Sequence, residues 1–197
     1  MKKLLLIVAV FMSIFLVGNV SAKTKALDLK DTLAAENIEL TEKYSENDKQ
    51  VTVYLFRGQG CSHCKEFLEY LSGSVKTQGS MFKLRSYEVW ENSDNNDLKE
   101  KVVETLKIDA SGVPLIIVGK DSFYGFDSST SKKLEKAIKN EYAKEKSKRY
   151  DVIKEASKLQ EKEEKAKKSN SAIILLIPII LIVVIIFLSR EPKENKA

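Results

Sequence analysis

Both cysteines and the only histidine of this 197-residue chain lie in one short motif, Gly60-Cys61-Ser62-His63-Cys64-Lys65. The motif follows an apolar run, residues 51–56, whose sequence is typical of a buried strand. Two cysteines three positions apart at the start of a helix can close a small disulfide ring on the helix N-terminus. There, unpaired backbone N–H groups and the helix dipole stabilise a thiolate. The motif therefore predicts a redox-active dithiol.

Two other interpretations of the motif stay open at this point. A purely structural disulfide would stabilise the chain little, because so short a ring removes little chain entropy. A metal site could use Cys61, His63 and Cys64, but the chain has no further Cys or His to complete a tetrahedral shell. The catalytic dithiol is favoured over both, and we expect neither a bound metal nor a cofactor.

The first 22 residues predict a signal peptide. Lys2 and Lys3 form a short basic region, residues 4–18 are apolar, and residues 19–22 end in small side chains where a signal peptidase would cut. An uncleaved N-terminal anchor is the alternative, and it would leave the following residues on the same side of the membrane. We therefore expect the chain from residue 23 to be exported to a compartment in which disulfides persist.

A second apolar segment predicts a transmembrane helix over residues 170–189. Its uncharged stretch and the flanking polar residues together reach the length of about 20 residues that a helix needs to cross a bilayer. The expected localisation is the cell membrane, with a single pass, the domain on the extracytoplasmic side and residues 190–197 as a cytoplasmic tail. The basic residues of this tail agree with that orientation, whereas the lysines that precede the span do not.

Strands and helices are predicted in a definite order between these two segments. Residues 23–50 form a polar segment in which Asp31 is a candidate N-cap of a short helix. From there the patterns predict a strand over 51–56, a helix from the motif to Gly73, a strand over 82–89, a helix over 97–107, strands over 114–118 and 122–126, and a helix from about Ser131. The turn-forming residues 92–96 and 119–121 separate these elements.

The composition changes after residue 131. Residues 23–131 carry 14 Lys and Arg against 18 Asp and Glu, whereas residues 132–168 carry 14 against 8 and contain no Gly or Pro. Apolar residues in this second block, among them Ile153, Ala156 and Leu159, recur at helical spacing. We expect a helix whose start packs on the domain, which ends at 143, and a charged helical stalk over residues 144–169.

The order of these elements resembles the thioredoxin superfamily over about Val51 to Glu141. A CxxC motif directly after an apolar strand, followed some fifty residues later by Gly112-Val113-Pro114 and a hairpin, carries the resemblance. It implies an α/β, thioredoxin-like fold, a central mixed sheet flanked by helices, for the domain over 51–143. It also implies that Pro114 is cis and lies against the dithiol, where the backbone of Val113 can pair with an extended substrate.

The resemblance also assigns roles in catalysis. Cys61, at the exposed end of the helix, would be the nucleophile, and Cys64 would be the buried resolving thiol. His63, close to the Cys61 sulfur, would stabilise the thiolate and make the disulfide more oxidising, as in disulfide oxidases and isomerases. The chain departs from thioredoxins at Gly60, where they carry tryptophan, and at Leu55, where they carry a buried acid. A cytoplasmic-style reductase is therefore disfavoured.

The expected function is that of an exported, membrane-anchored thiol-disulfide oxidoreductase of bacterial type, with the oxidase or isomerase direction favoured. Its partners would be protein thiols and disulfides and an unidentified redox partner that recycles the site. The modest net charge of +5 gives no reason to expect nucleic acid, and no segment suggests dimerisation, so we expect a monomer. A membrane-tethered copper- or metal-binding protein and a non-catalytic scaffold are the alternatives.

Overall fold

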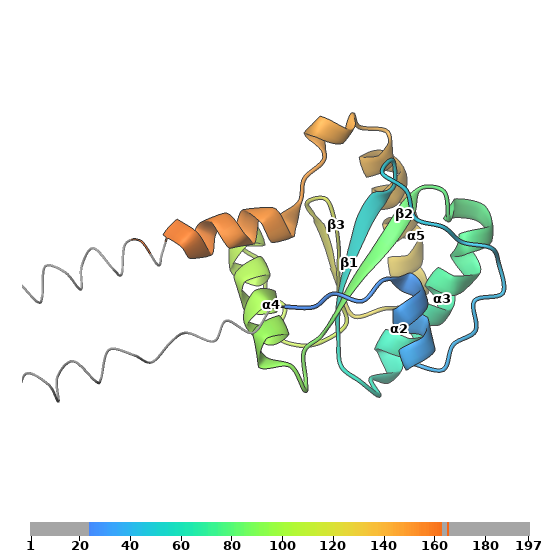
Figure 1. Ribbon diagram of the computed structural model, residues 1–197, viewed down its shortest axis with the longest axis horizontal. Helices are drawn as coiled ribbons and strands as arrows, with labels where there is room; N and C mark the ends of the chain where they lie inside the picture. The colour runs from blue at the N-terminus through green and yellow to red at the C-terminus, as the bar shows by residue number, and fades with distance from the viewer. Residues whose placement is uncertain (1–23, 163–164, 166–197) are drawn as a thin grey trace, which may run out of the picture.

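The fold is built on a four-stranded mixed sheet. The computed structural model describes residues 24–162 and Lys165, and it contains β1 (Val51–Arg57), β2 (Phe82–Glu88), β3 (Leu115–Val118) and β4 (Asp121–Tyr124). The strand order is β2-β1-β3-β4, and Figure 1 shows β1 between β3 and β2. β1 pairs with β2 in parallel, and β3 is antiparallel to both β1 and β4. The four predicted strands are thus confirmed as one sheet.

Helices cover both faces of this sheet, which explains why β1 is apolar throughout. Val53 and Leu55 are fully buried on one face, while Tyr54 and Phe56 are buried on the other. A strand buried on both faces lacks the alternation of apolar and polar residues that a half-exposed strand shows. A mixed sheet flanked by helices, together with a Cys-x-x-Cys pair, is compatible with a thioredoxin-like fold.

Three helices cover the first face: α2 (Leu29–Ala35), α3 (Ser62–Gln78) and α5 (Ser128–Tyr142). Two of the boundaries differ from the predictions. α3 continues past Gly73 to Gln78, because Val75 still packs in the core. α5 begins at Ser128, earlier than Ser131, because Asp127 caps it by accepting hydrogen bonds from the N–H groups of Ser129 and Thr130.

The second face is covered by α4 (Ser93–Leu106) and by a helix over residues 152–162, which we call the C-terminal helix (Figure 1). α4 begins at Ser93 and not near 97, because Asn92 caps it and residues predicted as a turn continue into the helix. Val152 and Ala156 of the C-terminal helix are buried in the same hydrophobic cluster as Tyr54 and Ile117. The structure therefore differs from the prediction of a solvated stalk beginning at 144.

The N-terminal segment is also part of the core. Leu29 and Leu33 of α2 are fully buried under the sheet, and Leu27 forms an isolated antiparallel bridge with Ser86 at the edge of β2. The N-cap of α2 is Asp28, whose carboxylate accepts the N–H of Asp31, so the assignment of Asp31 as the cap was wrong. Leu29 and Leu33, four positions apart, lie on the same face of this short helix.

Several predictions concern residues outside the described part of the chain. The signal peptide over 1–22, the transmembrane helix over 170–189 and the tail over 190–197 all lie there. Among the residues that the structure describes, no helix combines the length and the apolar character needed to cross a membrane.

Candidate redox site

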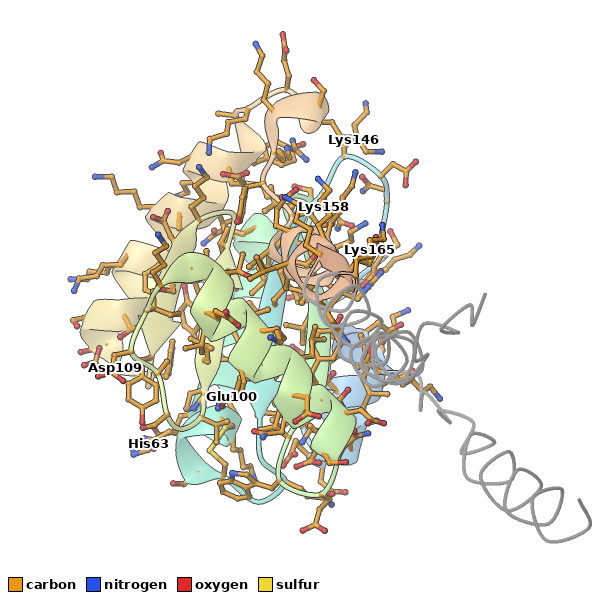
Figure 2. The ribbon with its side chains drawn as sticks, turned by 90° about the vertical axis from the view of Figure 1, so that its left-hand side faces the viewer. His63, Glu100, Asp109, Lys146, Lys158 and Lys165 are labelled. Atoms are coloured by element: carbon orange, nitrogen blue, oxygen red, sulfur yellow. A yellow bond between two sulfur atoms is a disulfide. The ribbon has the colours of Figure 1, made fainter. Side chains whose placement is uncertain are left out.

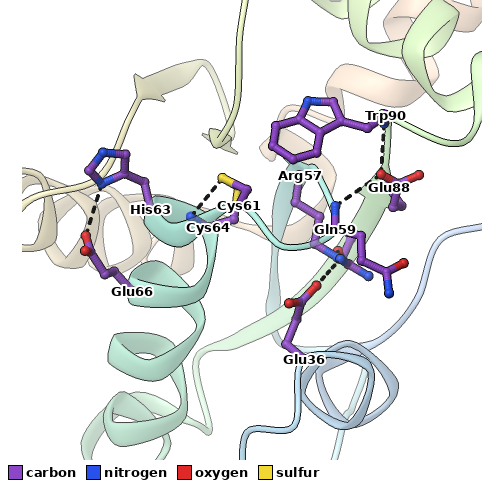
Figure 3. The surroundings of a disulfide bond; sticks show 10 residues. Glu36, Arg57, Gln59, Cys61, His63, Cys64, Glu66, Glu88 and Trp90 are labelled. Atoms are coloured by element: carbon purple, nitrogen blue, oxygen red, sulfur yellow. Dashed lines mark hydrogen bonds and ion pairs between the residues drawn. A yellow bond between two sulfur atoms is a disulfide. The ribbon is translucent and has the colours of Figure 1, made fainter.

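The two cysteines lie at the N-terminus of α3 and form a disulfide with each other (Figure 3). Cys61 is the N-cap residue, and its Sγ accepts a hydrogen bond from the backbone N–H of Cys64 at 3.2 Å. Cys61 keeps 8% of its surface exposed and Cys64 keeps 1%. Both cysteines are thus buried in the disulfide form, Cys64 more completely than Cys61, and the N–H groups at the start of the helix favour negative charge at Cys61.

A tight turn carries the chain from β1 into this helix. Gly60 has a φ of 77°, a left-handed conformation that glycine adopts without strain. The N–H of Cys61 donates to the carbonyl oxygen of Gly58 at 3.3 Å, which closes the turn. Gly60, noted above as a departure from the thioredoxin pattern, therefore has a structural reason of its own: the turn in this chain requires a positive φ.

A buried ion pair supports the start of this turn. Arg57, the last residue of β1, is buried and pairs with Glu36 at the C-terminal end of α2. Its Nε also donates to the hydroxyl of Ser86 at 3.1 Å. A buried charge is tolerated where a partner and hydrogen bonds compensate its desolvation. The pair joins α2 to β1, the hydrogen bond to Ser86 adds β2, and no local pattern in the sequence pointed to it.

His63 lies in the first turn of α3, but its ring points away from the disulfide (Figure 3). Its Nδ1 lies 3.2 Å from Oε2 of Glu66, and both side chains are exposed. The structure therefore brings Cys61 and Cys64 together and directs the imidazole toward a carboxylate. Within the residues described, no group of three or more His, Cys, Asp and Glu side chains is arranged to hold a metal ion.

Pro114 lies at the same end of the sheet as the dithiol. The Val113–Pro114 peptide bond is cis, which confirms the predicted geometry of this bond. β3 starts directly after it, and Leu115 pairs with Phe56 near the end of β1. The carbonyl oxygen of Pro114 accepts the N–H of Gly125 at 2.9 Å, which ties it to the end of β4.

Trp90 and Glu88 also belong to this end of the molecule, and the sequence reasoning missed both. The carboxylate of Glu88 accepts the backbone N–H groups of Gln59 at 3.3 Å, Trp90 at 2.8 Å and Glu91 at 2.9 Å. It thereby joins the turn before Cys61 to the loop after β2 (Figure 3). The only signal in the sequence was a lone tryptophan just after a strand, and such a residue is more often part of a core.

The site lies at one end of the molecule. Figure 2 shows His63 at the end opposite to Lys146. Comparisons of the chain with protein-family models, with curated proteins and with solved structures found no match in any of the three.

Proposed function

We propose that this protein is a thiol-disulfide oxidoreductase that exchanges disulfides with protein substrates through Cys61 and Cys64. The observation that carries the proposal is the disulfide at the N-terminus of α3, in which Sγ of Cys61, the less buried cysteine, accepts a backbone N–H. A thiolate at this position is stabilised by that N–H and by the helix dipole. The position of Val113 and Pro114 at the same end of the sheet gives further support.

The proposed exchange proceeds in two steps. A substrate thiolate attacks Sγ of Cys61 and forms a mixed disulfide, and Cys64 leaves as a thiolate that takes up a proton. A second substrate thiolate then attacks the substrate sulfur of the mixed disulfide, which forms the substrate disulfide and releases Cys61 as a thiolate. Two electrons pass from the substrate to the protein, and the reverse steps reduce a substrate disulfide. In both directions the backbone of Val113 is available to pair with the substrate chain.

Variants of the two cysteines test this assignment. In a disulfide-exchange assay with a peptide substrate, Cys61→Ser should abolish exchange because the attacking thiolate is lost. Cys64→Ser should retain the attack and accumulate mixed disulfides, which are visible by mass spectrometry, because nothing displaces the substrate. Equal activity of the two variants would contradict the roles, and an inactive wild-type protein would contradict the function.

The direction of exchange depends on the reduction potential of the pair. We propose the oxidising direction, oxidase or isomerase, because Cys-Ser-His-Cys places a histidine in the same turn as the nucleophile. Equilibration of the purified protein with glutathione buffers gives the potential directly. A potential as low as that of a strong reductant, about −270 mV, would contradict this direction.

We also propose that the domain works outside the cytoplasm as a monomer tethered to the cell membrane, where an unidentified partner recycles the dithiol. Support comes from the sequence alone, through the apolar segments over 4–18 and 170–189. Deletion of residues 170–197 should move the protein from the membrane fraction to the soluble fraction. Recovery of the full-length protein in the soluble fraction would contradict the tether.

A further inference from the structure

Two large hydrophobic side chains are exposed among the described residues. Trp90 is 58% exposed and Tyr124 is 56% exposed. Exposed tryptophan and tyrosine side chains are enriched where proteins contact partners, because they bury a large area at low entropic cost. Where they lie relative to the dithiol therefore indicates whether they could contact a substrate of the site.

The strand order places these two aromatic residues on either side of the dithiol. β1 and β2 are parallel, and β4 runs antiparallel to β3, which is antiparallel to β1. One end of the sheet is therefore formed by the ends of β2, β1 and β4 and by the start of β3. Across this end, from β2 to β4, the chain places Trp90 after β2, the turn to Cys61 after β1, Pro114 before β3, and Tyr124 at the end of β4. The aromatic residues are outermost, and the redox pair lies between them.

Trp90 is held in place on the turn that precedes Cys61. Glu88 accepts the N–H groups of both Trp90 and Gln59, so one carboxylate fixes the two loops together. The indole ring lies so close to Gly58 that a Cβ added there would come within 2.1 Å of it. Gly58 in turn accepts the N–H of Cys61. The indole ring is therefore exposed to solvent and at the same time held in a defined place by Glu88 and Gly58.

Tyr124 approaches the segment on the other side of the dithiol. It pairs with Leu115 in the β3–β4 hairpin. Its hydroxyl lies beside Gly112, where an added Cβ would come within 2.6 Å of it. Gly112 directly precedes Val113 and Pro114, so each aromatic residue contacts a glycine of a segment that forms the site.

We propose that Trp90 and Tyr124 are specificity-determining residues that select extended polypeptides with apolar side chains two positions before and after the reacting cysteine. This inference rests on the proposed oxidoreductase function and names the class of its substrates. Neighbouring strands are about 4.8 Å apart, so the distance across this end of the sheet from β2 to β4 is about 14 Å. An extended chain covers that distance in roughly four residues. In an extended segment, side chains at i−2, i and i+2 point to the same side. A cysteine facing the disulfide thus directs its second neighbours toward the two rings.

The test measures how fast the full-length, reduced protein in detergent reduces each of three oxidised probes. One is a peptide with phenylalanine at both second-neighbour positions of a single cysteine, held in a disulfide with glutathione. The second carries serine at those positions, and the third is oxidised glutathione. In each reaction the Cys61 thiolate attacks the probe, Cys64 displaces the mixed disulfide, and two thiols leave as the Cys61–Cys64 disulfide forms. Released thiols are measured by chromatography.

We expect the wild-type protein to reduce the phenylalanine peptide about tenfold faster than the serine peptide, a difference typical of a buried aromatic contact. Trp90→Ala and Tyr124→Ala should each lower this ratio several-fold, and Trp90→Phe should keep most of it. Lys146→Ala, at the opposite end of the molecule (Figure 2), is the control and should keep the wild-type ratio.

Three results would overturn the proposal. If the wild-type protein reduces the phenylalanine and serine peptides at about equal rates, the side chains that flank the cysteine do not affect recognition. A fall of all three rates together in Trp90→Ala shows that the indole only supports the turn before Cys61. Failure of the wild-type protein to reduce any probe, oxidised glutathione included, contradicts the proposed function itself and removes the basis of the selectivity.

Discussion

Single residues around the dithiol act mainly by fixing the position of their neighbours. Glu88 uses one carboxylate to bind three backbone N–H groups from two loops, and Gly58 allows an indole ring to rest directly on the backbone. Neither residue is reactive. Their effect is to place Trp90, the only tryptophan of the chain, beside the turn that leads to Cys61.

Substitution of Gly58 should displace Trp90 without unfolding the protein. In Gly58→Ala the new Cβ would overlap the indole, and the ring is exposed enough to move into solvent at a cost below about 1 kcal/mol of burial. We expect a red shift of the tryptophan emission and a nearly unchanged free energy of unfolding in urea. Gly73→Ala, in an exposed and open part of α3, is the matched control and should leave the emission unchanged. An unshifted spectrum in Gly58→Ala would contradict the packing of the ring.

Removal of His63 should make the dithiol less oxidising. His63 lies in the first turn of α3, and positive charge there would stabilise the Cys61 thiolate through space even with the ring directed toward Glu66. His63→Ala should lower the reduction potential by on the order of 30 mV, a tenfold change in the equilibrium with glutathione. Lys76→Ala, a cation at the other end of the same helix, should leave the potential unchanged. A potential that is unchanged or higher in His63→Ala would show that the histidine does not tune the site.

At the level of elements, helix boundaries depend on their caps. Asp127, Asn92 and Asp28 each accept backbone N–H groups that the first turn of α5, α4 or α2 cannot pair internally. These side chains begin two of the helices, α4 and α5, a few residues earlier than the apolar periodicity alone suggests. The carboxylate of Asp127 also accepts the hydroxyls of Ser129 and Thr130.

The cap of α5 should make the stability sensitive to acid. Hydrogen bonds from the N–H of Thr130 and from the hydroxyls of Ser129 and Thr130 lower the pKa of Asp127 to about 2. Because the folded-state pKa lies below the unfolded one, the cap contributes stability above pH ~4 and loses it as the pH falls toward 2. Asp127→Asn should therefore be less stable than wild type at pH 7, and the difference should shrink as the pH falls from about 4 through 2, measured by urea unfolding. A difference that stays constant from pH 7 to pH 2 would show that the charge is not the cause.

For the whole molecule, the C-terminal helix completes the second face of the sheet. Val152 and Ala156 are buried with Phe56 and Ile117, and the hydroxyl of Tyr54 donates to Asp151 at 2.8 Å. Burial and the nearby carboxylate of Asp151 raise the pKa of Tyr54 well above its usual range, so the hydroxyl stays protonated as a donor. The domain therefore extends beyond residue 143.

Truncation of one buried side chain in this helix should destabilise the entire domain. Val152→Ala removes two methyl groups from a fully buried site and should lower the free energy of unfolding by about 2 kcal/mol. Lys154→Ala, on the exposed side of the same helix, should change it by less than about 0.5 kcal/mol. Equal effects of the two substitutions would indicate a helix that does not pack on the sheet.

The sequence by itself determined the elements and the reactive pair. A CxxC motif after an apolar run and the turn residues are local signals, and they predicted the strands and the helix that begins at the CxxC motif. The cis Val113–Pro114 bond was expected from the family resemblance and not from a local signal. Local signals suffice for the elements because strand and helix periodicity depends on near neighbours.

Only the tertiary structure decided what surrounds the pair. The strand order brings Trp90 and Tyr124 to either side of the dithiol, the ion pair of Arg57 and Glu36 joins segments 21 residues apart, and Val152 reaches the core from far along the chain. Each of these contacts depends on which faces pack together. That choice is made by long-range burial of apolar surface, which no short window of sequence encodes.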